Sequence, residues 1–211
     1  MHTKIIEEVM TFAEPKFADW IRPFLSLENN KTDFLIGVRT PILRKLAKKY
    51  CNISHKTLNK LLTNKYHEIR ALALFIMVIK SKKEPEKMCE LYLKNHKHIN
   101  NWDLIDYTCP HIIAPIISKE ELIKLSDSDF LWENRTAMVS TIYYIKKNDF
   151  TLALNFAEKY IKHPHHLMHK AAGWMLREIG KKDLDTLINF LNKFSDTMPA
   201  IMKSYAREHL R

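Results

Sequence analysis

Glycine is scarce in this sequence, with only 3 in 211 residues. Two-residue β-hairpin loops need pairs such as Asn-Gly or Asp-Gly, which tolerate positive φ angles, and no such pair occurs. Hydrophobic residues make up 46% of the chain, which argues against disorder. The sequence therefore predicts an all-α fold, and its length allows one domain, residues 1–211, built as an array of small helical units.

Cysteine is also rare, and long apolar runs are missing. Cys51, Cys89 and Cys109 are scattered, odd in number and form no CxxC pair, so neither a zinc site nor a disulfide framework is predicted. No apolar run reaches the ~18 residues of a membrane span. The first residues turn acidic by Glu7 and lack the apolar stretch of a signal peptide. We expect a soluble, reduced, cytoplasmic protein.

Acidic residues are outnumbered by basic ones. Lys and Arg total 34 against 24 Asp and Glu, which gives a net charge of +10. Such a surface attracts polyanions, and nucleic acid is the first candidate. The alternative is a lysine-rich coding bias on a solvated surface, and charge alone leaves both open.

Helix signals recur along the chain. Thr40 followed by Pro41 is typical of an N-cap before proline at the first helical position. Ser118 with Glu121 matches the capping-box pattern. Gly180 is placed as a C-cap. The stretch 66–80 is apolar over most of its circumference, which predicts a buried helix.

Three segments resemble one another: residues 69–79, 134–145 and 169–179. Each has a basic residue, a small residue and then an apolar run, and the basic residues are Arg70, Arg135 and Lys170. The spacing fits stacked helix pairs, which form an α-solenoid with a concave face. Basic residues in the same phase would then make a positive stripe. The alternative is ordinary surface lysine and arginine on amphipathic helices.

Motifs of nucleotide or metal chemistry are missing. There is no Gly-rich phosphate loop, HExxH or nucleophile elbow. The cluster HPHHLMH contains His163, His165, His166 and His169 without an evident acidic or cysteine partner. We predict no metal and no cofactor, and we place these histidines at a helix start near a phosphate backbone.

The stretch NNWDLIDY, residues 100–107, puts an aromatic side chain and a carboxylate one helical turn apart. Trp102 and Asp106 share a face if the stretch is helical, with Asn101 or Asn100 as its N-cap. Asp103 lies in the first turn, where the helix dipole favours a carboxylate. Trp102 could simply be half-buried in a core, whereas Asp106 needs another explanation.

Five motifs occur in order: IGVRTPILRKLAKKY, NNWDLID, LWENRTAMVS, HKAAGWMLREIGKKD and MPAIMKSYAREHL. Together they resemble the bacterial DNA alkylation repair family, the AlkD-like DNA glycosylases, from about residue 30 to the C-terminus. The resemblance implies HEAT-like repeats that grip duplex DNA in a basic concave groove. It also implies a monofunctional hydrolase of base excision repair, which cleaves the N-glycosidic bond of N3- or N7-alkylated purines. Such a protein would act as a monomer in the bacterial cytosol, associated with the nucleoid through DNA.

The resemblance also assigns residues. Asp106 matches the catalytic aspartate, Trp102 and Trp174 the sugar-facing tryptophans, and Arg135 the phosphate-binding arginine. The expected DNA-binding residues are Arg135, Arg177, Lys170, Arg39, Thr40 and Arg44. The sequence departs from the family pattern at Asn101, where some members carry tryptophan or serine, and at Ala200, where many have a basic residue.

The family is described as leaving the damaged base stacked in the duplex, and a shallow groove would offer no deep purine pocket. The alternative function is a non-catalytic HEAT-like module that binds DNA or RNA at distorted or branched duplexes. A protein-binding scaffold is a third possibility. The first two hypotheses differ at Asp106, which only the enzyme needs.

Overall fold

The computed structural model describes residues 1–25 and 33–210, apart from the side chain of His209. The chain divides into two compact units, Met1–Ile112 and Ile113–Arg211. The described residues are mostly helical and contain no strand, only a single β-bridge between Phe34 and Tyr66. The all-α fold class is confirmed. The expectation of one domain stays a prediction.

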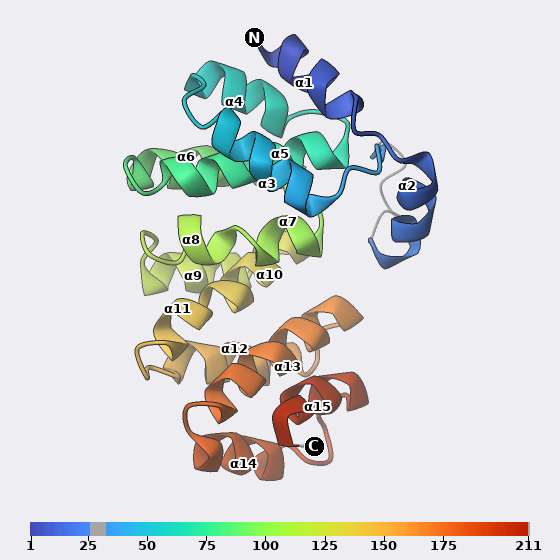
Figure 1. The fold of residues 1–211 in the computed structure, drawn as a ribbon. Coiled ribbons are helices and arrows are strands. Elements are labelled where there is room, and N and C mark those ends of the chain that lie inside the picture. Colours follow the sequence, from blue (N-terminus) through green and yellow to red (C-terminus); the bar gives the residue numbers. More distant parts are fainter. Residues whose placement is uncertain (26–32, 211) are drawn as a thin grey trace. The chain divides into compact units, whose positions relative to one another are not determined.

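Unit 1 consists of helices joined by short loops, which Figure 1 shows in blue to green. They are α1 (His2–Met10), α2 (Pro15–Ile21), η1 (Arg22–Phe24), α3 (Thr40–Lys49), α4 (His55–Leu62), α5 (His67–Lys80), α6 (Pro85–Lys94), η2 (His96–His98), α7 (Trp102–Asp106) and α8 (Cys109–Ile112).

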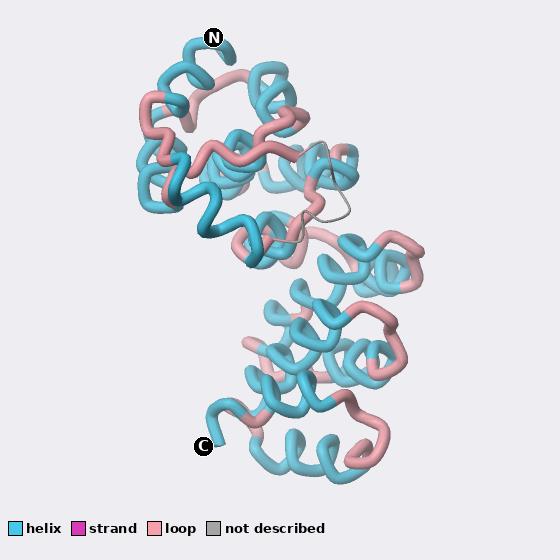
Figure 2. The backbone as a smooth tube through the Cα atoms, turned by 90° about the vertical axis from the view of Figure 1, so that its right-hand side faces the viewer, coloured by secondary structure: helices cyan, strands magenta, loops and turns pink. Residues whose placement is uncertain are grey.

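Unit 2 is built in the same way, and its loops alternate with helices along the tube in Figure 2. Its elements are α9 (Lys119–Ser126), α10 (Leu131–Ser140), α11 (Ile142–Ile145), α12 (Thr151–Tyr160), α13 (His166–Gly180), α14 (Leu184–Lys193), α15 (Ala200–Ala206) and η3 (Glu208–Leu210).

The three similar segments of the sequence are α5, α10 with α11, and α13. Each follows a shorter helix that packs against it, which gives the pairs α4–α5, α9–α10 and α12–α13. The second helix of each pair supplies much of the core, because eight consecutive residues of α5, 67–74, are buried. The helix-pair repeat that the sequence predicts is therefore present in each unit.

Local signals start and stop most helices as expected, with two corrections. The capping box at Ser118 and Glu121 is present, with both hydrogen bonds formed. Helix α3 begins at Thr40 itself and has Arg39 as its N-cap, one residue earlier than predicted. The prediction of a C-cap at Gly180 is wrong, because α13 continues through Gly180 and its cap is Lys181 in the right-handed region.

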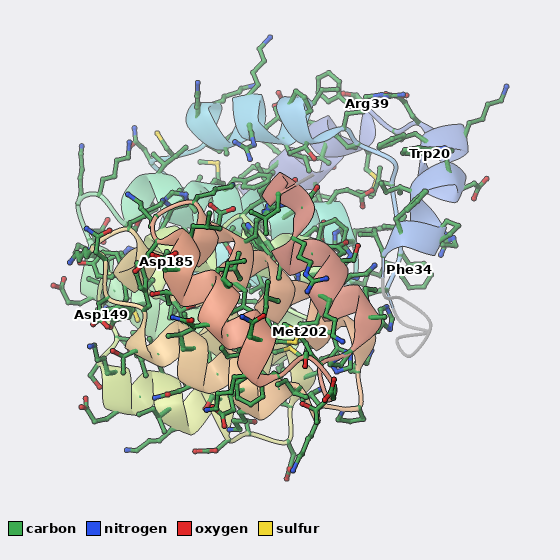
Figure 3. All side chains as sticks on the ribbon, turned by 90° about the horizontal axis from the view of Figure 1, so that it is seen from below. Trp20, Phe34, Arg39, Asp149, Asp185 and Met202 are labelled. Atoms are coloured by element: carbon green, nitrogen blue, oxygen red, sulfur yellow. The ribbon has the colours of Figure 1, made fainter. Side chains whose placement is uncertain are left out.

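Two glycines allow close approach of the backbone. Gly37 has φ of +86°, and a Cβ there would lie 2.1 Å from the carbonyl oxygen of Glu14. Gly173 lets α13 pack on α15, since a Cβ there would lie 2.5 Å from the carbonyl oxygen of Met202, labelled in Figure 3. Both positions therefore exclude any side chain unless the backbone moves.

The predicted positive stripe is wrong for its arginines, which point into the protein. Arg70 is 2% exposed and its guanidinium pairs with Asp33 at 2.8 Å. It also donates to the carbonyl oxygens of Asn64 and Lys65. Arg135 is 4% exposed and donates to the carbonyl oxygen of Leu167 at 2.6 Å. A guanidinium group carries several N–H donors, so Arg70 can tie the loop before α5 to that helix, and Arg135 ties α10 to the first turn of α13.

Candidate functional site

The short helix α7 carries the two residues that the sequence placed on one face. The side chain of Asn101 caps the helix by accepting from the backbone N–H of Trp102 at 2.9 Å, which confirms the predicted N-cap. The indole N–H of Trp102 donates to the carbonyl oxygen of Phe24 in η1 at 2.9 Å. Trp102 is therefore half-buried and held in one orientation.

Asp103 fastens α7 to α5 across unit 1. Its Oδ2 lies 2.8 Å from Nε2 of His67, the first residue of α5, and the His67 side chain is 4% exposed. Burial alone would lower the pKa of His67, but the charge and hydrogen bond of Asp103 outweigh it and raise that pKa above its ordinary value. Asp103 thus has a second structural role beyond the helix dipole.

Asp106 is the last residue of α7 and is partly exposed. The next residue, Tyr107, is 48% exposed. Arg44 of α3 lies over the ring of Tyr107 at 5.5 Å and over that of Phe75, in α5, at 5.2 Å. The guanidinium group of Arg44, a predicted DNA-binding residue, therefore lies against two aromatic rings. One of them belongs to Tyr107, the residue after Asp106.

A cavity of about 160 Å³ lies in unit 1 beside α7. Residues of α2, α3, α5 and α7 line it, together with the loops that flank them. Trp102, Asp103 and His67 all belong to its wall. The sequence did not predict this cavity, because its walls come from segments that are up to about 90 residues apart in the chain.

The other two residues predicted for DNA binding in unit 1 stand at the start of α3. Arg39 is exposed, pairs with Glu14 at 3.0 Å and lies 4.3 Å from the centre of the Phe17 ring. Thr40 is exposed and contributes to the cavity wall. Trp20 projects from the neighbouring α2, where Figure 3 labels it, and is 61% exposed.

In unit 2, three of the predicted residues form a row along α13. Lys170, Trp174 and Arg177 are four and three residues apart, so they share one face of the helix, and all three are partly exposed. The ammonium group of Lys170 lies 6.0 Å from the centre of the Tyr205 ring in α15. The structure thus brings these three residues together on one face, and their contact with DNA stays a prediction.

Glu178 joins the members of that row. Its Oε1 accepts from the indole N–H of Trp174 at 3.2 Å and from Lys181 at 2.7 Å, and it pairs with Arg177 at 3.4 Å. Burial would raise the pKa of Glu178, but Lys181, Arg177 and Trp174 together lower it. Arg177 also pairs with Glu208. The charge of Arg177 is thus balanced within the protein.

The histidine cluster has a structural use. His165 is the N-cap of α13, where its Nδ1 accepts from the backbone N–H of Leu167, and its own N–H donates to Nδ1 of His163. Burial lowers the pKa of both His163 and His165. No group of three metal-binding side chains is found among the described residues.

Sequence reasoning missed the residues that support the site from a distance. His67, Glu178 and Phe24 each make a hydrogen bond that fixes a predicted residue or its helix. Only Glu178 could have been found, because it lies four residues after Trp174 and therefore on the same face of the helix. The other two contacts depend on how separate segments pack.

Comparisons with known proteins agree with the fold. A model of the family described as DNA alkylation repair enzyme matches residues 5–210. A solved structure, a predicted DNA alkylation repair enzyme from Enterococcus faecalis, superimposes with a TM-score of 0.70 at 12% identity. The match covers 94% of this chain and 96% of that one. A search of curated proteins finds no match. Within the described residues, no helix is both long and apolar enough to cross a membrane.

Proposed function

Because the chain belongs to the family of DNA alkylation repair enzymes, we propose that it is a monofunctional DNA glycosylase. Its substrate would be duplex DNA that contains N3- or N7-alkylated purines, and its reaction hydrolysis of the N-glycosidic bond. The observation that carries the proposal is the position of Asp106, partly exposed at the end of a short helix whose first turn is held by hydrogen bonds to η1 and α5.

The reaction needs a negatively charged carboxylate rather than a proton donor. Alkylation at N3 or N7 gives the purine a positive charge, so the base can leave without being protonated. Positive charge then grows on the deoxyribose, as in other glycoside hydrolyses. A carboxylate about 4 Å away contributes about 4 kcal/mol at an effective dielectric near 20, which is roughly a thousandfold in rate. Asp106 would supply this charge and orient the attacking water.

The rigidity of α7 supports this role. The Asn101 side chain accepts from the backbone N–H of Trp102, the Trp102 indole donates to the carbonyl oxygen of Phe24, and His67 pairs with Asp103. These contacts hold the first two residues of the helix. A catalytic carboxylate must stay within a fraction of an ångström of its working position, and fixed supporting contacts achieve this. Trp102 would offer π-electron density to the developing cation.

Residues of unit 2 would contribute phosphate and sugar contacts. Lys170 and Arg177 lie on the face of α13 that also carries Trp174, and phosphate contacts of this kind position a protein without reading sequence. Arg135 remains a proposed phosphate ligand, although one of its N–H groups is already bonded to Leu167.

Strand cleavage is not part of the proposal. A bifunctional glycosylase needs an amine that forms a Schiff base with the sugar. The described residues of the cavity wall beside α7 include no lysine. We therefore expect release of the free base and an intact strand with an abasic site.

The deciding experiment uses duplex DNA methylated at guanine N7. Under single-turnover conditions the wild-type protein should release 7-methylguanine, whereas Asp106→Asn should release it about a thousandfold more slowly, because the stabilising charge is lost. Binding of the same duplex should be unchanged or tighter in Asp106→Asn.

The matched control is Asp129→Asn, which removes the same charge from an exposed residue outside any helix. This variant should keep the wild-type rate. Absence of any base release by the wild-type protein would favour the non-catalytic binding module instead.

A further inference from the structure

Two histidine side chains in succession hold the start of α13. The backbone N–H of Leu167 donates to Nδ1 of His165 at 3.2 Å, and the backbone N–H of His165 donates to Nδ1 of His163 at 3.0 Å. Nε2 of His163 lies 3.3 Å from Oδ1 of Asn134, in α10. Three hydrogen bonds in series therefore attach the first turn of α13 to α10.

These bonds require both histidine rings to be neutral. A backbone N–H only donates, so Nδ1 of each ring must be an unprotonated acceptor, and the proton of each neutral ring is on Nε2. The Nε2–H of His163 then donates to Asn134. A histidine cation carries a proton on both ring nitrogens and has no acceptor left. Protonation of His163 or His165 would therefore break a bond that holds the first turn of α13.

The surroundings keep the two rings neutral at pH 7. The titratable groups around them come from α10, α12 and α13 and are Arg135, Lys159, Tyr160, His166 and His169. Burial lowers the pKa of both rings, and the basic groups of this set lower it further. Asp127 pairs with Lys159 at 2.5 Å, and burial raises the pKa of Tyr160, which stays uncharged. Because both rings are partly exposed, a phosphate placed beside them would favour their charged form.

The first turn of α13 also holds Arg135. This side chain is 4% exposed, and its Nη1 donates to the carbonyl oxygen of Leu167 at 2.6 Å. The N–H of the same Leu167 donates to His165. A guanidinium group so buried cannot meet a phosphate unless the turn moves. Loss of the cap lets a helix start fray, and Arg135 would then exchange a backbone carbonyl for a charged phosphate, which forms the stronger hydrogen bond.

We propose that the start of α13 is a proton-dependent switch for DNA binding, in which protonation of His163 and His165 opens the first turn and lets Arg135 bind a phosphate. This switch rests on the proposed function, which assigns Arg135 to the DNA backbone. Coupling of this kind is reciprocal, so protons strengthen the binding of DNA and DNA strengthens the binding of protons. The histidine cluster thereby regulates the site without being part of it.

The first test follows the turn itself in the free protein. Hydrogen exchange of the amides at positions 165 and 167, corrected for the intrinsic rate at each pH, reports the two capping bonds. We expect their protection in the wild type to fall about fivefold or more between pH 7.5 and pH 5, the usual effect of losing an N-cap. Unchanged protection would overturn the proposal.

The matched control is the double variant His163→Asn, His165→Asn. An asparagine side chain accepts from the backbone N–H two residues later, which is the spacing of both capping bonds, but it does not titrate. Protection of the two amides in this variant should be the same at pH 7.5 and at pH 5. A fall as large as that of the wild type would assign the effect to other groups and refute the switch.

The second test measures binding of an unmodified duplex by fluorescence anisotropy at the same two pH values. On acidification the wild type should gain about tenfold more affinity than the double variant, because one charge-assisted hydrogen bond is added. Arg135→Gln, which lacks the guanidinium group, should gain no more than the double variant. Equal gains in the wild type and in Arg135→Gln would mean that the histidines act only through their own charge, and the switch would fall.

The outcomes separate the switch from the glycosylase. Release of 7-methylguanine by a protein without pH-dependent exchange at positions 165 and 167 would sink the switch and leave the glycosylase intact. A pH-dependent gain in affinity without any base release would support the switch and sink the glycosylase. If Arg135→Gln does not fold, exchange of the Leu167 amide in the wild-type complex with duplex at pH 5 decides. Full protection there would show that the turn stays closed and would overturn the proposal.

Discussion

At the scale of single residues, the role suggested by the residue type differs most from the role in the structure for arginine. The sequence presents Arg70 and Arg135 as equivalent surface cations, but both are buried: Arg70 donates to a carbonyl oxygen of the loop before α5, and Arg135 to that of Leu167 in the first turn of α13. A sequence pattern predicts the face of the helix on which such a residue lies. It does not show whether the nearest hydrogen-bond acceptor is a phosphate or a backbone carbonyl. Arg44, which is exposed over two rings, remains the better candidate for a DNA contact in unit 1.

Gly173 allows a test of how tightly α13 packs on α15, because alanine at this position adds a single carbon atom. Replacing glycine by alanine inside a helix usually stabilises it by roughly 0.5–1 kcal/mol. Here the new Cβ would lie 2.5 Å from the carbonyl oxygen of Met202 and 2.6 Å from Cβ of Tyr205. We expect Gly173→Ala to destabilise the protein by about 1–3 kcal/mol through overpacking.

Thermal unfolding followed by circular dichroism measures the effect of Gly173→Ala. An unchanged or higher melting temperature would show that α15 moves away from α13 at little cost. Activity should be measured on the same sample, because Trp174 is the next residue and a shift of α13 would displace it.

At the scale of elements, the position of α7 depends on α5. Helix α7 has only five residues, too few to be stable alone, and a buried His67–Asp103 pair attaches it. Because the pKa of His67 is raised in the folded protein, the folded state binds this proton more tightly than the unfolded state. The stabilisation is fully present below the unfolded pKa of about 6.5 and is lost as the pH rises through the raised value.

His67→Gln tests this linkage, because glutamine can still donate to Asp103 but carries no charge. We expect His67→Gln to lower the free energy of unfolding by about 1–3 kcal/mol at pH 6. The difference from the wild type should shrink by pH 9. The depressed pKa values of His163 and His165 act in the opposite direction but are common to both proteins, so they cancel in the difference.

Urea denaturation of both proteins at several pH values gives this difference directly. A gap between wild type and His67→Gln that widens with rising pH would contradict a raised pKa for His67.

Most elements could be predicted from the sequence, and the reasons are local. The capping box at Ser118, the cap at Asn101 and the buried helix over 66–80 each depend on residues within one or two turns. The end of α13 was misplaced because Gly180 tolerates helical as well as left-handed angles. The cavity and the His67–Asp103 pair were missed because they depend on packing between segments distant in the chain.

At the scale of the whole molecule, a net charge of +10 favours binding of DNA. However, carboxylates of the protein itself pair with some of the basic side chains that DNA phosphates would contact. Arg177 pairs with both Glu178 and Glu208, and Arg39 pairs with Glu14. A phosphate must displace or share these partners before it gains full contact. The number of basic residues in the sequence therefore overstates the number available to DNA.

Glu208→Gln tests this competition. With one carboxylate removed, Arg177 should reach a phosphate more readily, so affinity for an unmodified duplex should rise a few-fold. The slope of log K against log salt should steepen by about 0.9 if one further phosphate contact forms. Fluorescence anisotropy over a range of salt concentrations measures both.

Glu90→Gln is the control, because Glu90 is exposed in α6 and its replacement changes the net charge equally. Equal shifts for Glu90→Gln and Glu208→Gln would mean that only total charge matters and that Arg177 makes no new contact.

The start of α5 also predicts where homologous chains can differ in length. His67 and Glu68 are neighbours, yet Glu68 accepts from the backbone N–H of Gly37, 31 residues earlier, while His67 holds Asp103, 36 residues later. Inserting or deleting one residue inside this first turn would rotate the following side chains by about 100° around the helix. Both attachments would fail together, so homologous chains should vary in length at the loop after Lys80 and stay constant in length at the start of α5.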